Sequence, residues 1–178
     1  GPFVFPGIQR VQINPHLNPV YCFENLIVGE CNKMGFTAAE SISMSPGKTA
    51  FNPLFLFGGP GLGKTHLMHS IGHFVLEQNQ NMKVLYVTSE QFTNEVIESI
   101  RSGNAAAMTK LRDKYRTVDV LLIDDVQFII GKESTQEEFF HTFNVLHSSG
   151  KQIILSSDKP PKEMETLDER FRSRFEWG

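Results

Sequence analysis

The sequence predicts an α/β fold in which a parallel sheet is flanked by helices. Two observations support this prediction. Short apolar runs alternate with segments of helical periodicity along most of the 178 residues, a pattern typical of parallel strands joined by helical crossovers. One apolar run, residues 52–57, leads directly into the glycine-rich segment GGPGLGKT, residues 58–65, and a segment with helical spacing follows. Strand, glycine loop and helix in this order are the expected setting of a phosphate-binding loop.

The N-terminal half is expected to contain a lead-in segment, two helices and two strands. Residues 1–20 hold four prolines and are predicted to be extended, with residues 1–2 a remnant of tag cleavage. The nucleotide-binding domain would then span residues 21–178. Within it we expect a helix at about residues 31–43, the first core strand at 52–57, a helix from the glycine loop to about residue 78, and a second strand at 84–88.

The C-terminal half is expected to add two strands and several helices. Ser89 is predicted to cap a helix that ends at residues 102–104, and another helix runs to about residue 115. The most apolar strand is expected at residues 118–123, followed by a helix at 135–148 and a strand at 152–156. Two prolines at 160–161 should stop regular structure, and residues 168–175 are predicted to form a short charged helix.

Composition narrows the classes of function. The net charge of −3 argues against a broad electrostatic nucleic-acid surface, although not against a narrow contact site. Cys22 and Cys31 lack C-x-x-C spacing and are expected to be reduced and structural. No apolar run reaches the length of a membrane span, and no secretory signal is visible. We therefore expect a globular cytoplasmic protein that is not integral to a membrane.

The glycine-rich segment fits G-x-x-x-x-G-K-[ST], in which each fixed residue has a separate physical role. The glycines let successive backbone N–H groups point into one anion-binding hollow. Lys64 would reach the β- and γ-phosphates, and the Thr65 hydroxyl would bind Mg²⁺. The alternative is a glycine turn without a ligand. We predict an ATP- or ADP-binding loop that comprises Gly58, Gly59, Gly61, Leu62, Gly63, Lys64, Thr65 and His66.

Acidic residues follow two of the predicted strands. Asp124 and Asp125 end the most apolar strand, and Asp158 follows the next one. The carboxyl edge of a parallel sheet is where open α/β folds bind ligands. We expect Asp124 to hold Mg²⁺ through water, and Asp125 to orient or deprotonate the attacking water. Asp158 would sense the γ-phosphate. The alternative for all three is a strand-ending turn, in which Asp is common.

The ordered elements closely resemble the AAA+ ATPase core of the DnaA family of bacterial replication initiators. The resemblance covers about residues 14–178, and its longer strings are more specific than the phosphate loop alone. They are NPLF (52–55), GLGKTHL (61–67), TSEQF (88–92), VDVLLIDDVQF (118–128), TQEEFFHTFN (135–144) and SRFEWG (173–178). The resemblance implies that residues 21–178 form the base subdomain of an AAA+ P-loop ATPase.

The family resemblance also implies roles for individual residues. Arg174 matches an arginine finger that a neighbouring subunit inserts toward the γ-phosphate, and Asp158 takes the sensor role. Val28, Gly29 and Asn32 lie where the family contacts adenine. Single-stranded DNA would be contacted by Ile97, Lys132 and Thr135, although family members often carry a basic residue in place of Ser134.

Each of these roles has a simpler alternative. The arginines at 170, 172 and 174 would pair with neighbouring acids on a solvated helix. Ile97 would simply pack against neighbouring side chains, and Lys132 would be a solvent-exposed lysine in a loop. His66, His69 and His73 share a helical face, but a metal site there is disfavoured because no acidic partner is evident.

The resemblance implies that ATP acts mainly as an assembly switch with weak hydrolysis. ATP-bound subunits would stack into a filament, open an origin duplex, hold single-stranded DNA and engage a replicative helicase. The family's helical lid and duplex-reading helix-turn-helix domain would follow Gly178. We therefore expect this chain alone to bind nucleotide weakly and to lack sequence-specific duplex binding. The alternative functions are a related AAA+ helicase loader or regulatory protein, and a motor that turns over ATP.

Overall fold

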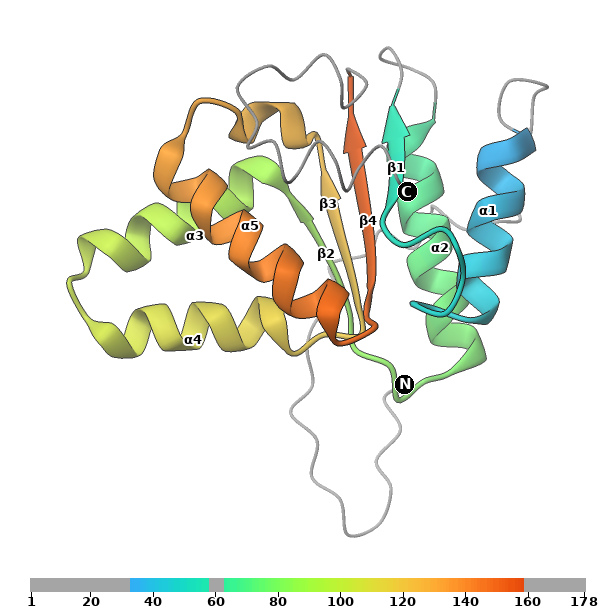
Figure 1. The fold of residues 1–178 in the computed structure, drawn as a ribbon, viewed down its shortest axis with the longest axis horizontal. Helices are drawn as coiled ribbons and strands as arrows, with labels where there is room; N and C mark the ends of the chain where they lie inside the picture. Colours follow the sequence, from blue (N-terminus) through green and yellow to red (C-terminus); the bar gives the residue numbers. More distant parts are fainter. Residues whose placement is uncertain (1–32, 58–62, 159–178) are drawn as a thin grey trace, which may run out of the picture.

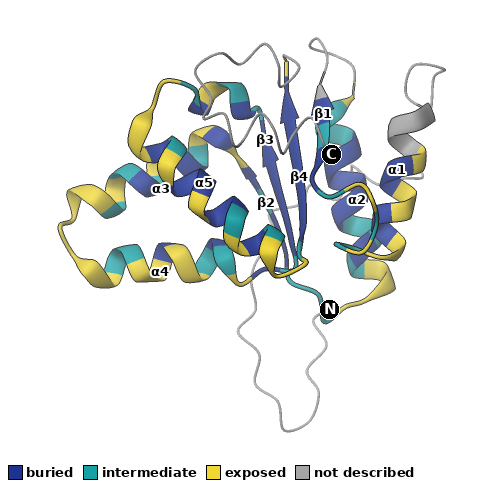
Figure 2. Ribbon diagram, in the orientation of Figure 1, coloured by how far each residue is buried: buried dark blue, intermediate teal, exposed yellow. Residues whose placement is uncertain are grey.

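A four-stranded parallel sheet forms the centre of the molecule in the computed structural model, which describes residues 33–57 and 63–158 (Figure 1). The strands lie in the order β1-β4-β3-β2. Their bounds are β1 Leu54–Phe57, β2 Val84–Thr88, β3 Val120–Asp124 and β4 Gln152–Ser157. Every residue of β3 and β4 is buried (Figure 2), as expected for parallel strands covered on both faces.

Helices cover both faces of this sheet and complete three layers. On one face α2 (Lys64–Gln78) packs on the strands, and α1 (Lys33–Met44) packs on α2. The other face carries α3 (Ser89–Arg101), α5 (Glu133–Ser148) and the short 3-10 helix η3 (Val126–Ile129), with α4 (Ala105–Arg116) packed against α3 and α5 (Figure 1). The predicted α/β class with a flanked parallel sheet is therefore confirmed.

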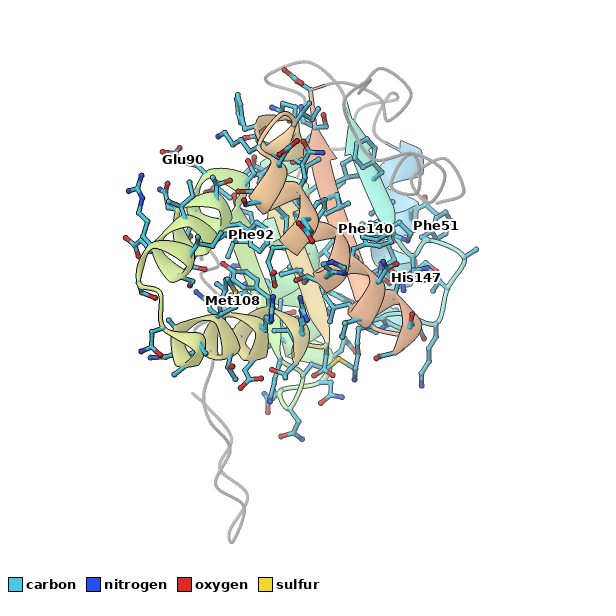
Figure 3. The ribbon with its side chains drawn as sticks, turned by 60° about the vertical axis from the view of Figure 1, so that its left-hand side comes forward. Phe51, Glu90, Phe92, Met108, Phe140 and His147 are labelled. Atoms are coloured by element: carbon cyan, nitrogen blue, oxygen red, sulfur yellow. The ribbon has the colours of Figure 1, made fainter. Side chains whose placement is uncertain are left out.

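Alternation along the strands divides the core in two. Leu54, Leu56, Val84, Val120, Leu122 and Ile154 face α2 and its residues Met68 and Ile71. The intervening strand residues Leu85, Val87, Leu121, Ile123, Ile153 and Leu155 face the other layer, together with Phe92 of α3 and Met108 of α4 (Figure 3). Because successive side chains on a strand point to opposite faces, two apolar faces require an almost continuous apolar run.

Most element boundaries lie within two residues of the predicted ones. The first strand starts at Leu54 rather than at residue 52, because the side chain of Asn52, instead of its backbone, forms the hydrogen bonds with the backbone around the start of β4. Its Nδ2 donates to the Lys151 carbonyl at 2.7 Å, and its Oδ1 accepts from the Ile153 N–H at 3.0 Å. Helix η3 was not expected from the sequence. The predicted lead-in segment, the proline stop at 160–161 and the helix at 168–175 lie outside the described residues.

One capping prediction is wrong. Ser89 is the first residue of α3, and Thr88 is its cap, because the Thr88 hydroxyl accepts from the Gln91 N–H at 3.1 Å. The Ser89 hydroxyl donates instead to the carbonyl of Asp125 at 2.6 Å. Ser89 thus ties the start of α3 to the end of β3. Within the two described ranges, no helix is both long and apolar enough to cross a membrane.

Candidate nucleotide-binding site

A glycine in the left-handed conformation directly precedes α2. Gly63 precedes the helix with φ 79° and ψ 17°, in the left-handed region that glycine adopts at least cost. Its carbonyl accepts from the Leu67 N–H at 2.9 Å, so the helix begins immediately at Lys64. The backbone N–H groups of a first helical turn have no partner within the helix and favour anions. Lys64, Thr65 and the partly buried His66 lie in this turn, whereas Gly58, Gly59, Gly61 and Leu62 lie outside the described residues.

The first acidic residue at the end of β3 meets this turn directly. The Thr65 hydroxyl donates to Asp124 Oδ2 at 2.7 Å, across 59 residues of sequence. Strand β4 lies between β1 and β3 in the sheet, so this contact spans the carboxyl end of β4. Because Thr65 uses its proton toward Asp124, the lone pairs of its oxygen are directed elsewhere. The start of α2 and the end of β3, which were assigned to Mg²⁺ binding from the sequence, are therefore adjacent.

Asp124 is held by two more hydroxyls, which sequence reasoning missed. The Tyr86 hydroxyl donates to Oδ2 at 2.7 Å, and the Ser156 hydroxyl donates to Oδ1. The Asp124 residue itself is only 2% exposed. Tyr86 lies on β2, and Ser156 lies at the position where the apolar run of β4 turns polar. That polar break was the available signal for Ser156, whereas Tyr86 looks like any aromatic strand residue.

Asp125 has an unusual backbone and a perturbed carboxyl group. Its φ of 58° and ψ of 51° are left-handed, a conformation that is uncommon outside glycine. Its N–H donates to the Ser156 oxygen at 2.8 Å, and Gln127 Nε2 donates to its Oδ1 at 3.4 Å. Burial raises the pKa of Asp125 above its ordinary value, and the charge of Asp124 raises it further. A carboxyl group with a raised pKa suits the predicted role toward water.

Asp158 follows β4 and completes an acidic edge with Asp124 and Asp125. It is exposed, and its N–H donates to Gln127 Oε1 at 3.3 Å. Because Gln127 also donates to Asp125, one amide side chain connects the two aspartates. The charge of Asp158 contributes to the raised pKa of Asp125, although less than burial and Asp124 do. All three predicted acids thus gather at the carboxyl edge of the sheet.

The histidines of α2 lie near the acidic end of β3, and the surroundings of His69 are the best defined. His69 is 4% exposed, and its ring lies 4.2 Å from the Tyr86 ring, centroid to centroid, at an angle of 42°. Burial lowers the pKa of His69, the charge of Asp124 partly offsets this, and His73 and His66 lower it further. No group of three or more His, Cys, Asp or Glu side chains that could hold a metal ion occurs among the residues described.

The other predicted site residues are only partly placed. Ile97 is partly buried on α3, and Lys132 is exposed at the residue preceding α5. Thr135 lies inside α5, and at 2% exposure its side chain is buried. Val28, Gly29 and Asn32, assigned to adenine, and Arg170, Arg172 and Arg174 lie outside the described residues.

Comparison with known proteins identifies the family. Residues 17–178 match the bacterial DnaA ATPase domain. The chain belongs to this family. It is 64% identical over 163 residues to the chromosomal replication initiator protein DnaA of Lachnoclostridium phytofermentans, covering 92% of this chain and 36% of that protein. The chain thus spans about a third of the length of this relative.

Solved structures of DnaA proteins share this fold closely. Domain III of the Thermotoga maritima DnaA matches with a TM-score of 0.85 and 48% identity, covering 91% of this chain and 66% of that one. A replication initiator DnaA bound to AMPPCP and single-stranded DNA matches with a TM-score of 0.85 and 40% identity, over 92% of this chain and 49% of that one. The DnaC helicase loader, at 13% identity and a TM-score of 0.65, shares the fold alone.

Proposed function

We propose that this DnaA-family chain is the ATP-binding switch module of a bacterial replication initiator. The observation that carries the proposal is the 2.7 Å contact between Thr65 and Asp124, which joins the phosphate-binding helix to the acidic end of β3. In P-loop proteins these two groups share a Mg²⁺ ion on the nucleotide phosphates. The family match over residues 17–178 supports the same role.

The donor set fits Mg²⁺ and nucleoside phosphates. Mg²⁺ prefers oxygen ligands and retains several waters, so one hydroxyl, one nearby carboxylate and phosphate oxygens are sufficient. Thr65 would bind the ion with its free lone pairs, and Asp124 would bind one of its waters. Lys64 and the amides of the first turn of α2 would hold the phosphates. A bound Mg²⁺ would neutralise charge that develops on the phosphate oxygens.

Asp125 is the group proposed to act on the attacking water. Its raised pKa reflects burial beside Asp124, and Gln127 restrains its side chain. We propose that Asp125 orients this water and accepts its proton, while Asp158 contacts the γ-phosphate or the same water. Hydrolysis would be slow because aspartate is one methylene shorter than glutamate. With slow hydrolysis, bound ATP would act as a switch for assembly rather than as the energy source of a motor.

Contact with single-stranded DNA belongs to the same proposal. A solved relative at 40% identity holds AMPPCP and single-stranded DNA together. On this chain Ile97 and the exposed Lys132 are available at the surface. Thr135, whose side chain is buried, would contribute through its backbone in the first turn of α5. A narrow site of this kind is compatible with a net charge of −3.

The remaining partners concern the full-length protein. We propose that residues 21–178 form the nucleotide-binding subdomain, and that Arg174 acts as a finger toward a neighbouring subunit's ATP. The longer protein would assemble with ATP, open the origin duplex in the cytoplasm and engage the replicative helicase.

A matched pair of lysine substitutions tests nucleotide binding in the full-length protein. Lys64→Ala should abolish retention of labelled ATP, because the phosphates lose their only full positive charge within the loop pattern. Lys48→Ala changes an exposed lysine in the turn before β1 and should leave retention unchanged. Undiminished ATP retention by Lys64→Ala would refute the proposal.

Two alternative functions are less well supported. The DnaC helicase loader shares the fold but only 13% identity with this chain, against 64% for the curated initiator. A motor would turn over ATP within the usual enzyme range of about 1–1000 per second. Steady-state hydrolysis well below that range would favour the switch, whereas turnover inside it would favour the motor.

A further inference from the structure

We infer that Tyr86 and Ser156 are positioning residues that fix the Asp124 carboxylate, so that the Mg²⁺-dependent part of nucleotide affinity depends on them. The inference rests on the proposed function, because it concerns how this site holds its ion. Neither residue is expected to touch the nucleotide or the ion itself. Both would act by holding Asp124 in one orientation.

The hydrogen bonds at Asp124 leave the carboxylate little freedom. Oδ2 accepts from Thr65 and from Tyr86, each at 2.7 Å, and Oδ1 accepts from Ser156. An ionised carboxylate offers about four acceptor positions, so three are filled and one, on Oδ1, remains. That position is available to a water ligand of the ion. At 2% exposure Asp124 has little solvent to replace a lost donor.

The three donors come from three different elements. Tyr86 lies on β2 and Ser156 on β4, the two strands that flank β3, and Thr65 lies on α2. A rotation of the carboxylate would therefore break contacts on both sides at once. Hydrogen bonds to an ionised group are shorter and stronger than neutral ones, which makes this arrangement stiff.

Both donors are themselves held in place. The Tyr86 ring packs against buried His69 of α2, the helix that also carries Thr65. The Ser156 oxygen accepts from the Asp125 N–H at 2.8 Å while its proton goes to Asp124. Ser156 therefore couples the two neighbouring acids, and Tyr86 couples Asp124 to the phosphate-binding helix. Outer residues that orient metal ligands in this way typically change metal affinity 10–100-fold when substituted.

The test is Tyr86→Phe in the full-length protein, with Tyr115→Phe as its matched control. Both substitutions remove one phenolic hydroxyl that donates a part-buried hydrogen bond to a carboxylate, since Tyr115 of α4 donates to Glu95 of α3. The affinity for a fluorescent ADP analogue is measured in Mg²⁺ and in EDTA. Tyr86→Phe should weaken binding in Mg²⁺ at least about tenfold while changing binding in EDTA less than about twofold. Tyr115→Phe should change neither affinity.

Ser156→Ala removes the hydrogen bond to the other carboxylate oxygen and provides an independent measurement if Tyr86→Phe folds poorly. It should also lower the ratio of affinities in Mg²⁺ and EDTA. An unchanged ratio in both variants would overturn the inference, as would equal losses in Mg²⁺ and EDTA, which indicate a structural role alone. Failure of the unsubstituted protein to bind nucleotide would instead overturn the proposed function.

Discussion

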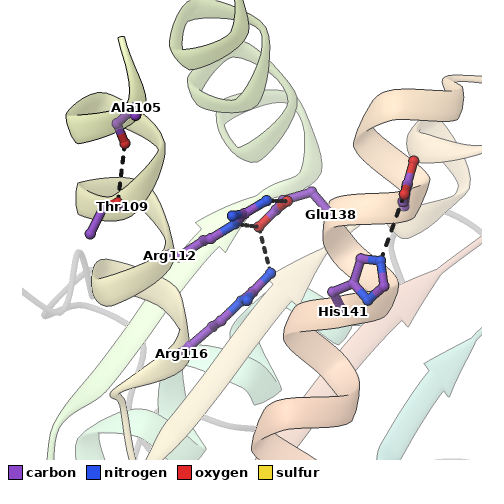
Figure 4. Close-up of polar contacts among 7 residues, drawn as sticks. Ala105, Thr109, Arg112, Arg116, Glu138 and His141 are labelled. Atoms are coloured by element: carbon purple, nitrogen blue, oxygen red, sulfur yellow. Dashed lines mark hydrogen bonds and ion pairs between the residues drawn. The ribbon is translucent and has the colours of Figure 1, made fainter.

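A buried carboxylate on α5 should contribute measurably to the stability of this chain. Glu138, whose side chain is 8% exposed, faces two arginines of α4 (Figure 4). Arg112 Nε and Nη2 donate to its two oxygens at 3.2 and 3.3 Å, and Arg116 Nη2 donates to Oε1 at 2.8 Å. Glu138 accordingly raises the pKa of Arg112 through this hydrogen bond and its charge. The cluster fastens α4 to α5.

The magnitude follows from the exposure of each arginine. In Glu138→Ala, water can hydrate Arg112 because its side chain is 46% exposed, so losing the Arg112 bond lowers the free energy of unfolding only slightly. Arg116 is 22% exposed and loses a charged partner in a mostly buried position. Hydrogen bonds to charged groups contribute about 1.5–3 kcal/mol, and breaking a buried pair costs about 3–5 kcal/mol. Because the arginines are partly exposed, Glu138→Ala should lower the free energy of unfolding by roughly 2–4 kcal/mol, or the melting temperature by about 5–15 °C.

The measurement is urea or thermal unfolding followed by circular dichroism, with Glu137→Ala as the control. Glu137 is the neighbouring glutamate on α5, but its side chain is 76% exposed and its Oε1 lies 3.7 Å from His141 Nε2. Its replacement should change stability by no more than about 0.5 kcal/mol. A loss below about 1 kcal/mol for Glu138→Ala, or equal losses in both variants, would show that the bonds between Glu138 and the two arginines do not stabilise the fold as expected.

Two further substitutions test the loop before β1 and the acidic edge. Gly47→Ala should cost more than about 3 kcal/mol, because φ is +77° and a Cβ would lie 2.0 Å from the Gly150 carbonyl oxygen. Gly103→Ala, with φ +60° and open space, should cost only about 1–2 kcal/mol by the same unfolding assay, and similar costs would contradict the predicted clash. Burial raises the folded-state pKa of Asp125, so this carboxyl favours folding at low pH and loses that contribution as pH rises through the folded value. Asp125→Asn should therefore be more stable than the parent at pH 7 in EDTA and no more stable below about pH 4, and a gain independent of pH would contradict the assignment.

The sequence predicted the class of fold because strand and helix periodicities are local properties. The apolar runs at residues 84–88 and 152–156 became β2 and β4 with almost the same bounds. Prediction failed where a side chain made a distant bond. The Asn52 side chain, rather than its backbone, forms hydrogen bonds with the Lys151 carbonyl and the Ile153 N–H, so β1 starts two residues later than predicted. The Ser89 hydroxyl donates to the Asp125 carbonyl, and Thr88 caps α3 instead.

The candidate nucleotide site also has features that local sequence predicts and features that depend on distant contacts. The phosphate loop was predicted, and the acids that end the strands were located, from short, ordered patterns that can be read along the chain. The three-dimensional arrangement was needed to show that β4 lies between β1 and β3 and that Tyr86 and Ser156 donate hydrogen bonds to Asp124. Strand order and side-chain partners depend on contacts between residues dozens of positions apart, and no local periodicity records which strands become neighbours.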